Sequence, residues 1–152
     1  MTTLVLGNQL SRLQRFLEGT SGPLRYICLV ETKESRLIRD YLCLRPGAEE
    51  IPKAKLFREQ SEEFRGKYIE FMGRLNSANY SHQWWAMSFT NKYPLGTPLC
   101  RNAFELLLTV NLLHSGSQPL LVITDSTDLA EQATQWAKTK KLTKTVDCFD
   151  RP

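Results

Sequence analysis

Short apolar runs alternate with amphipathic segments along this chain. Four runs have the branched and aromatic composition of buried strands, and they lie at 3–7 (TLVLG), 25–31 (RYICLVE), 120–125 (LLVITD) and 144–149 (KTVDCF). Between them, apolar residues recur at helical spacing, which predicts helices over 8–18, 33–44, 58–77, 99–114 and 128–140. The segment DLAE at 128–131 resembles a capping box, which predicts Asp128 as the N-cap of the last helix.

Strands that alternate with helices indicate right-handed βαβ units and a mostly parallel sheet. We therefore expect an α/β fold, a Rossmann-like three-layer domain with a sheet of four to five strands. Residues 50–114 are mainly helical in pattern, and we expect them to form an insertion within a single domain spanning 1–152. The chain ends on a predicted strand, whereas such domains commonly continue with a helix, so it could be the N-terminal part of a longer protein.

Composition narrows the class of protein. The chain has 152 residues, of which 41% are hydrophobic and 24% charged, as in an ordinary globular domain. Its net charge of +4 is small and scattered, which does not favour a nucleic-acid-binding protein. The N-terminus lacks the features of a signal peptide, and no apolar run is long enough to cross a bilayer. The four cysteines are Cys28, Cys43, Cys100 and Cys148, and none forms a CxxC pair, so we expect no zinc site. Cys28 and Cys148 fall within predicted strands, where free cysteine behaves as a small buried apolar residue, so we expect a reduced, cytoplasmic setting.

Polar residues follow three of the predicted strands. In open parallel sheets, ligands bind beyond the carboxyl ends of the strands, which here are followed by GNQ, ETKE and TDSTD. From these loops we expect Asn8, Glu31 and Asp125 to bind a hydroxyl-rich ligand. The alternative is that the loop residues only cap helices, since Asn, Asp, Ser and Thr are the preferred N-caps; it applies to Asn8, Ser126, Thr127 and Asp128.

Several catalytic signatures do not occur in the sequence. It has no GxGxxG after the first strand, so the dinucleotide-binding fingerprint is missing. It also has no GxxxxGK[ST] and no GxSxG, which argues against a P-loop NTPase and an α/β-hydrolase. His82 and His114 are the two histidines, and neither has a metal-ligand or nucleophile partner at a recognisable spacing. We therefore assign no catalytic residue and expect neither a cofactor nor a metal.

The segment YSHQWWAMSFTNKYPLG at 80–96 carries two adjacent tryptophans among polar residues. Neighbours on a helix point about 100° apart, so Trp84 and Trp85 cannot share one narrow face. We expect one to pack in the core and the other to lie at a boundary, where its ring could stack on a sugar. Trp84 and Lys92 are therefore candidate ligand-binding residues. The alternative is that this segment docks the helical insertion on the sheet or on a second domain.

The stretch HQWWAMSFTNKYPLGTPLCRNAFELLLTVNLL resembles a pattern in a family of surface-carbohydrate biosynthesis proteins that are glycosyltransferase-like. The likeness lies in the two tryptophans, Ser88, Lys92, Pro94 and the following apolar helix, with LVLG and LLVITD in compatible places. It covers roughly two thirds of the chain and no established catalytic motif. The resemblance implies the N-terminal domain of a twin-Rossmann glycosyltransferase, which would hold a carbohydrate acceptor. Most of the nucleotide-sugar site, and hence activity, would then belong to a second domain.

Two alternatives remain open at this point. The same crevice could serve a stand-alone, non-catalytic binding or regulatory module, which needs no second domain. The opening LVLGNQL is also similar to that of photolyase-related proteins, whose N-terminal domain is α/β. In that family an aspartate is common where Asn8 stands, and no flavin-binding segment is recognisable in this sequence.

Overall fold

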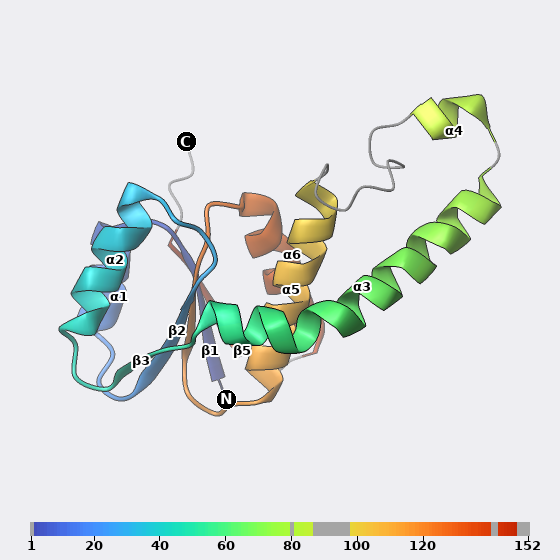
Figure 1. Cartoon of the computed structure of the whole chain (residues 1–152). Coiled ribbons are helices and arrows are strands. Elements are labelled where there is room, and N and C mark those ends of the chain that lie inside the picture. Colours follow the sequence, from blue (N-terminus) through green and yellow to red (C-terminus); the bar gives the residue numbers. More distant parts are fainter. Residues whose placement is uncertain (1, 80, 87–97, 141–142, 149–152) are drawn as a thin grey trace. The chain divides into compact units, whose positions relative to one another are not determined.

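The computed structural model describes residues 2–79, 81–86, 98–140 and 143–148 (Figure 1). In chain order its elements are β1 (Thr2–Gly7), α1 (Leu10–Glu18), β2 (Leu24–Cys28), α2 (Lys33–Cys43), β3 (Ala48–Glu50), α3 (Lys53–Ala78), α4 (His82–Ala86), α5 (Pro98–His114), β4 (Leu120–Ile123), α6 (Thr127–Thr139) and β5 (Thr143–Cys148). The chain divides into two compact units, one made of residues 1–53 and 108–152 and the other of residues 54–107.

The first unit is built on a five-stranded sheet whose order is β3-β2-β4-β1-β5, with every pair parallel. Helices α1 and α2 cover one face, whereas α6 and the final turns of α5 cover the other (Figure 1). This confirms the predicted Rossmann-like three-layer α/β fold. The strand order is neither 3-2-1-4-5-6 nor 2-1-3-4-5, the two common doubly wound orders, because β4 lies between β2 and β1.

The central strands are apolar because both of their faces are covered. All four residues of β4 are buried, as are Leu4, Val5 and Leu6 of β1. On one face they meet Leu13 and Leu17 from α1 together with Ile38 and Leu42 from α2. Cys28 and Cys148 are buried at the ends of β2 and β5 and form no disulfide, as expected for cysteines that act as small apolar residues.

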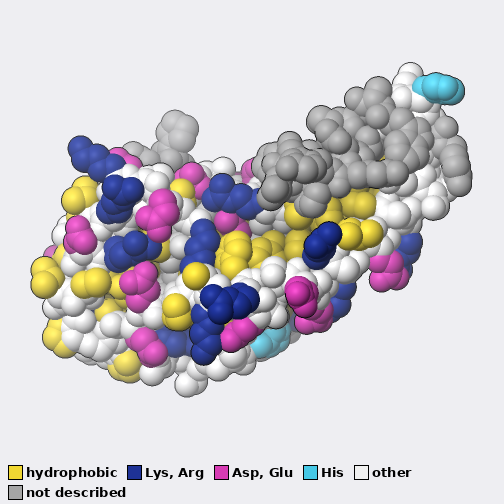
Figure 2. Space-filling view, in the orientation of Figure 1, with side chains coloured by type: hydrophobic (Ala, Val, Ile, Leu, Met, Phe, Trp, Pro, Cys, Tyr) yellow, Lys and Arg dark blue, Asp and Glu magenta, His cyan; other side chains and the backbone are white. Residues whose placement is uncertain are grey.

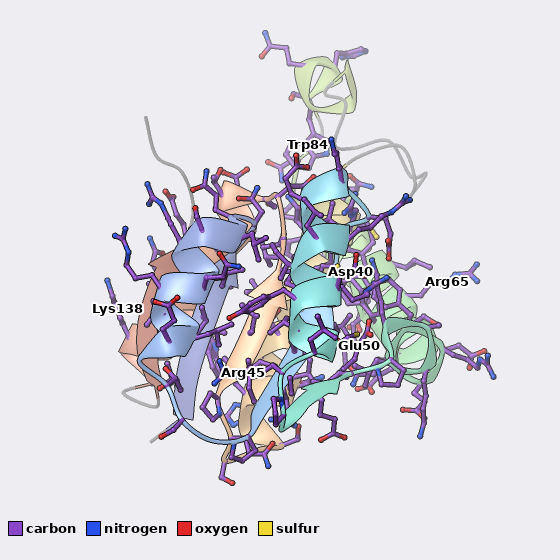
Figure 3. The ribbon with its side chains drawn as sticks, turned by 90° about the vertical axis from the view of Figure 1, so that its left-hand side faces the viewer. Asp40, Arg45, Glu50, Arg65, Trp84 and Lys138 are labelled. Carbon is purple, nitrogen blue, oxygen red and sulfur yellow. The ribbon has the colours of Figure 1, made fainter. Side chains whose placement is uncertain are left out.

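Two arginines bind the carboxyl ends of helices in this unit. Arg45 donates to the carbonyl of Leu17 (2.9 Å) and to that of Thr20, at the end of α1 (Figure 3). Arg25, on β2, donates to the carbonyl of Leu112 in the last turn of α5 (3.1 Å). The last carbonyls of a helix have no partner within it and carry partial negative charge, so both arginines stabilise these ends.

Two local predictions about the sheet unit were wrong. No strand was expected between the helix at 33–44 and the helical insertion at 50–114, but Ala48–Glu50 pairs with β2 as edge strand β3. Ser126, and not Asp128, is the N-cap of α6: its backbone is extended and its Oγ accepts a hydrogen bond from the Leu129 N–H. Asp128 lies in the first turn of the helix, beyond the cap.

The second unit contains most of α3, α4 and the first part of α5. Its aromatic contacts join Phe104 to Phe57 (ring centroids 4.7 Å apart) and to Phe64 (4.9 Å). Apolar residues recur at helical spacing along α3; of these, Met72 is buried but Phe71 is half exposed. In the described residues, no helix of either unit has the length and hydrophobicity needed to cross a bilayer.

The solvent-facing side of α3 carries ion pairs of opposite charge spaced four residues apart. Lys67 contacts Glu63 (2.6 Å) and Arg74 contacts Glu70 (2.8 Å). Such exposed pairs stabilise a helix only slightly. Figure 2 shows basic and acidic side chains interspersed over the face drawn there, with no large surface of one sign. On this face, the charge that is scattered along the sequence is also scattered in space.

Candidate functional site at the carboxyl edge of the sheet

Four neighbouring strands end at the same level of the sheet. Cys28 of β2 pairs with Ile123 of β4, which pairs with Gly7 of β1, and Gly7 also pairs with Cys148 of β5. The loops after β2, β4 and β1 therefore leave one edge side by side. With roughly 5 Å between adjacent strands, the starts of the β2 and β1 loops are about 10 Å apart.

The loops at this edge leave in opposite directions. The chain passes from β1 into α1 and from β2 into α2 on one face, whereas β4 leads into α6 on the other face (Figure 1). Because β4 lies between β2 and β1, its loop diverges from both neighbours. Such a change of direction is a topological switch point, the place where open parallel sheets bind ligands.

The ends of β1 and β5 approach each other closely at Gly7. A Cβ built at Gly7 would lie 2.6 Å from Cys148 Cβ and 2.7 Å from the carbonyl carbon and oxygen of Cys148. These distances are well below normal contact, so only glycine fits between the two strand ends. After Gly7 the chain makes a short loop, Asn8 and Gln9, before α1 begins.

Asn8 is half buried directly after β1, at the switch point. The alternative that Asn8 caps α1 is wrong, because Gln9 is the N-cap. The Gln9 side chain makes no capping hydrogen bond, and the first turn of α1 has no acidic residue. Asn8 thus lies just before the N-cap of α1, and the Gln9 amide lies at the N-cap without making a capping hydrogen bond.

The β4 loop is fixed by hydroxyl groups on either side of Asp125. Thr124 is buried, and its Oγ1 accepts a hydrogen bond from the Ser126 N–H (3.1 Å). Ser126 Oγ in turn accepts from the Leu129 N–H (3.1 Å), which completes the cap of α6. The cap alternative is therefore correct for Ser126. Asp125 itself is exposed between these two fixed residues.

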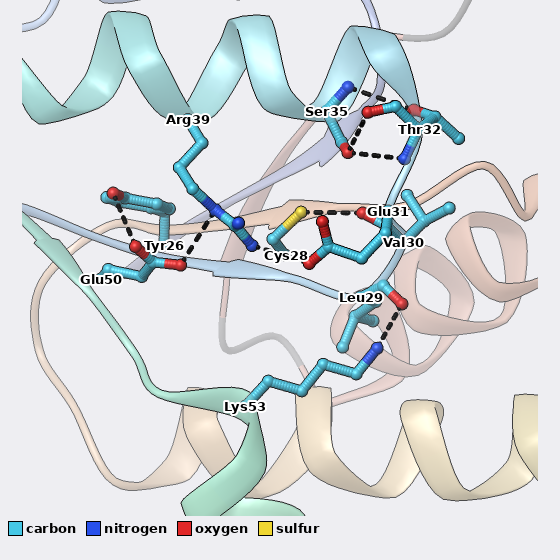
Figure 4. A network of polar contacts seen from close by, with 10 residues as sticks. All are labelled: Tyr26, Cys28, Leu29, Val30, Glu31, Thr32, Ser35, Arg39, Glu50 and Lys53. Atoms are coloured by element: carbon cyan, nitrogen blue, oxygen red, sulfur yellow. Dashed lines mark hydrogen bonds and ion pairs between the residues drawn. The ribbon is translucent and has the colours of Figure 1, made fainter.

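The β2 loop is held by polar contacts from α2 and from Lys53 (Figure 4). Thr32 and Ser35 form a reciprocal capping box at the start of α2. The Lys53 amine donates to the carbonyl of Leu29 (2.5 Å). Glu31 is exposed, and its Oε1 accepts from Arg39 Nη2 (3.0 Å). That bond is the main reason why the pKa of the Arg39 guanidinium is raised.

A buried tyrosine lies on β2, the strand that leads into this loop. Tyr26, on β2, is 2% exposed, and its hydroxyl lies 3.3 Å from Glu50 Oε2 and 3.7 Å from Cys43 Sγ. Burial, followed by the hydrogen bond with Cys43 and the negative charge of Glu50, raises the pKa of Tyr26. The phenol therefore stays neutral and can donate to Glu50 throughout the ordinary pH range.

The structure brings three of the expected residues to one edge of one unit: Asn8, Glu31 and Asp125. Trp84 belongs to the other unit, on α4, where its Nε1 donates to Asn76 Oδ1 (3.0 Å) (Figure 3). Lys92 lies outside the described residues.

Sequence reasoning named Gln9 only as part of the GNQ loop, and it missed Arg39 and Lys53. The contacts of Arg39 with Glu50 and of Lys53 with the Leu29 carbonyl depend on β3 lying beside β2, which no local signal in the sequence marks.

Within the described part of the chain, no group of three or more His, Cys, Asp or Glu side chains could hold a metal ion. The edge instead offers amide, hydroxyl and carboxylate groups, which suit hydrogen bonding to hydroxyls. Neither known protein families, nor curated proteins, nor solved structures gave a match to this chain.

Proposed function

We propose that this chain is the acceptor-side domain of a glycosyltransferase-like protein of surface-polysaccharide biosynthesis, acting in the cytoplasm. Its carboxyl edge would hold a hydroxyl-rich carbohydrate between the loops after β1, β2 and β4. A nucleotide-sugar would be bound mainly by a second domain, so the isolated chain is expected to bind without catalysing transfer.

The observation that carries the proposal is the switch point at β4. There Asn8 and Asp125, from strands that are direct neighbours, lie where their loops diverge to opposite faces. An amide both donates and accepts hydrogen bonds, and a carboxylate accepts up to about four, which matches the paired donors and acceptors of sugar hydroxyls. The resemblance of the tryptophan segment to carbohydrate-biosynthesis proteins supports the same ligand class.

Binding to a printed glycan array, followed by solution titration of the best ligands, tests this proposal. We expect the wild-type chain to bind a subset of uncharged glycans, and Asn8→Ala and Asp125→Asn to weaken that binding. Asp40→Asn is the matched control, because Asp40 is exposed on α2 and away from the three loops. No binding to any glycan, or equal binding by all four proteins, would refute the assignment of this edge.

The same experiment separates the alternatives. Glycan binding with transfer once a second domain and a nucleotide-sugar are supplied supports the transferase. Glycan binding without transfer under those conditions favours a stand-alone module. Copurification of a flavin, with no glycan bound, would favour the photolyase-related reading.

A further inference from the structure

Four side chains link the core of the sheet to the exposed end of β2. Tyr26 comes from β2, Glu50 from the end of β3, Arg39 from α2 and Glu31 from the loop after β2 (Figure 4). The Tyr26 hydroxyl donates to Glu50 Oε2 (3.3 Å), Arg39 Nε lies 3.1 Å from Glu50 Oε1, and Arg39 Nη2 donates to Glu31 Oε1 (3.0 Å). Tyr26 is buried, the side chains of Glu50 and Arg39 are 40% and 31% exposed, and the Glu31 side chain is 57% exposed.

Stability alone gives little reason for this arrangement. Exposed ion pairs contribute about 0–1 kcal/mol, and the Arg39 side chain remains 31% exposed. What the arrangement does provide is orientation. The guanidinium is a rigid planar fork, and here it contacts one carboxylate on each side. Glu50 is itself fixed by the buried Tyr26, so Arg39 holds Glu31 in one place relative to the sheet.

Glu31 retains acceptor capacity in this position. A carboxylate has about four lone-pair directions, and the contact with Arg39 engages Oε1. Glu31 follows β2, so it lies on the same edge of the sheet as Asn8 and Asp125. Because β4 lies between β2 and β1, the loop that carries Asp125 lies between Glu31 and Asn8. Hydrogen bonds to a charged acceptor are stronger than those to a neutral one. The negative charge would at the same time disfavour an anionic ligand.

We infer that Arg39 is a positioning residue, and that the Glu31 carboxylate it fixes selects uncharged sugar hydroxyls over phosphorylated sugars at the carboxyl edge. This inference rests on the proposed function, since it concerns the ligand class of the same site. Arg39 acts through Glu31 and does not itself contact the ligand. Tyr26 and Glu50 act through Arg39 in the same way.

The test is a titration of the full chain with methyl hexosides and the matching hexose phosphates, followed by ligand-observed NMR. Glu31→Gln should weaken hexoside binding by roughly ten-fold, as expected when a charged hydrogen-bond acceptor is neutralised. It should also reduce the preference for the hexoside over its phosphate. Arg39→Gln should weaken binding by at least about threefold in the wild-type background, and have no further effect in Glu31→Gln, because the two residues act as one unit.

Control variants and one conservative substitution distinguish a positioning role of Arg39 from a purely structural one. Arg36→Gln and Asp40→Asn remove the same kinds of charge from exposed positions of α2 and should leave both affinity and preference unchanged. Arg39→Lys keeps the positive charge and most of the aliphatic stem but loses the planar guanidinium. If Arg39→Gln unfolds the protein, Arg39→Lys should remain folded and should still weaken hexoside binding.

The outcomes separate this inference from the proposal beneath it. In one outcome, Asp125→Asn weakens hexoside binding while three other variants leave it unchanged: Arg39→Gln, Arg39→Lys and Glu31→Gln. That result would overturn the inference and keep the proposed function. Independent, additive effects of Arg39→Gln and Glu31→Gln would overturn the positioning role. Tighter binding of hexose phosphates than of hexosides would overturn the selection for uncharged ligands. Absence of any sugar binding would overturn both.

Discussion

Replacing Gly7 by alanine is the sharpest test of how the edge is built. The new methyl group would lie 2.6 Å from Cys148 Cβ and 2.7 Å from the Cys148 carbonyl carbon and oxygen. Ordinary contacts between carbon atoms are about 3.5–4.0 Å, so β1 and β5 would have to separate locally by about 1 Å. Two of the three nearest atoms are main-chain atoms, so no change of a side-chain rotamer can relieve the overlap.

The expected cost follows from overpacking a filled site. Such insertions destabilise by about 1–3 kcal/mol, and alanine recovers about 0.4–1 kcal/mol by restricting the unfolded chain. A net loss of about 1–2 kcal/mol should lower the melting temperature by roughly 2–8 °C in a chain of this size. The loss should persist in Gly7→Ala combined with Cys148→Gly, because the main-chain overlap at residue 148 remains.

Urea and thermal unfolding of the full chain, followed by far-UV circular dichroism, measure this loss. Gly19→Ala is the matched control in the same unit, because its Cβ would meet only the Phe16 carbonyl oxygen at 3.7 Å, an ordinary contact. Equal stability of Gly7→Ala and Gly19→Ala would show that β1 and β5 are not in the register described above. Complete relief of the loss by Cys148→Gly would show that only side-chain atoms clash.

Further changes test the caps, the helix surface and the buried phenol. Ser126→Ala should cost about 1 kcal/mol in urea unfolding, and Asp128→Ala only about 0.5 kcal/mol, since Ser126 holds the cap and Asp128 only favours the helix dipole. Gly73→Ala should stabilise α3 by about 0.5–1 kcal/mol, because its Cβ would meet no atom within 4 Å; a loss of stability would mean that this face is covered. The pKa of Tyr26 is raised in the folded state, so its contribution to stability is complete below the unfolded pKa of about 10 and declines as pH rises above it. Stability should therefore fall between pH 10 and 11 in the wild type and less in Tyr26→Phe, as measured by urea unfolding at each pH; parallel curves would contradict this.

The sequence predicted the layers well because burial leaves a local mark. Strands covered on both faces must be apolar throughout, as in residues 120–123, and covering helices must repeat apolar residues at helical spacing. Strand β3 had no such mark. Ala48, Glu49 and Glu50 are largely exposed at the edge of the sheet, so their composition reads as a loop.

The site was predictable only in part. Because the carboxyl ends of parallel strands share an edge, Asn8, Glu31 and Asp125 could be grouped from the sequence alone. Which strands are neighbours could not be read from the sequence, since the order places β4 between β2 and β1. For the same reason, the contact of Arg39 with Glu50 was not foreseeable, because it depends on β3 pairing with β2.

The strand order also bears on how the chain acquires its structure during synthesis. Strand β1 pairs with β4 and β5, so Leu4 lies between Leu120 and Thr145, and it makes no ladder with β2. Strand β1 therefore has no strand partner until the chain as far as β4 has also been synthesised. Pairings of such wide separation form slowly, and the apolar β1 stays available to other strands meanwhile. We therefore expect aggregation to threaten mainly the nascent chain, which should depend on chaperones more than the folded protein does.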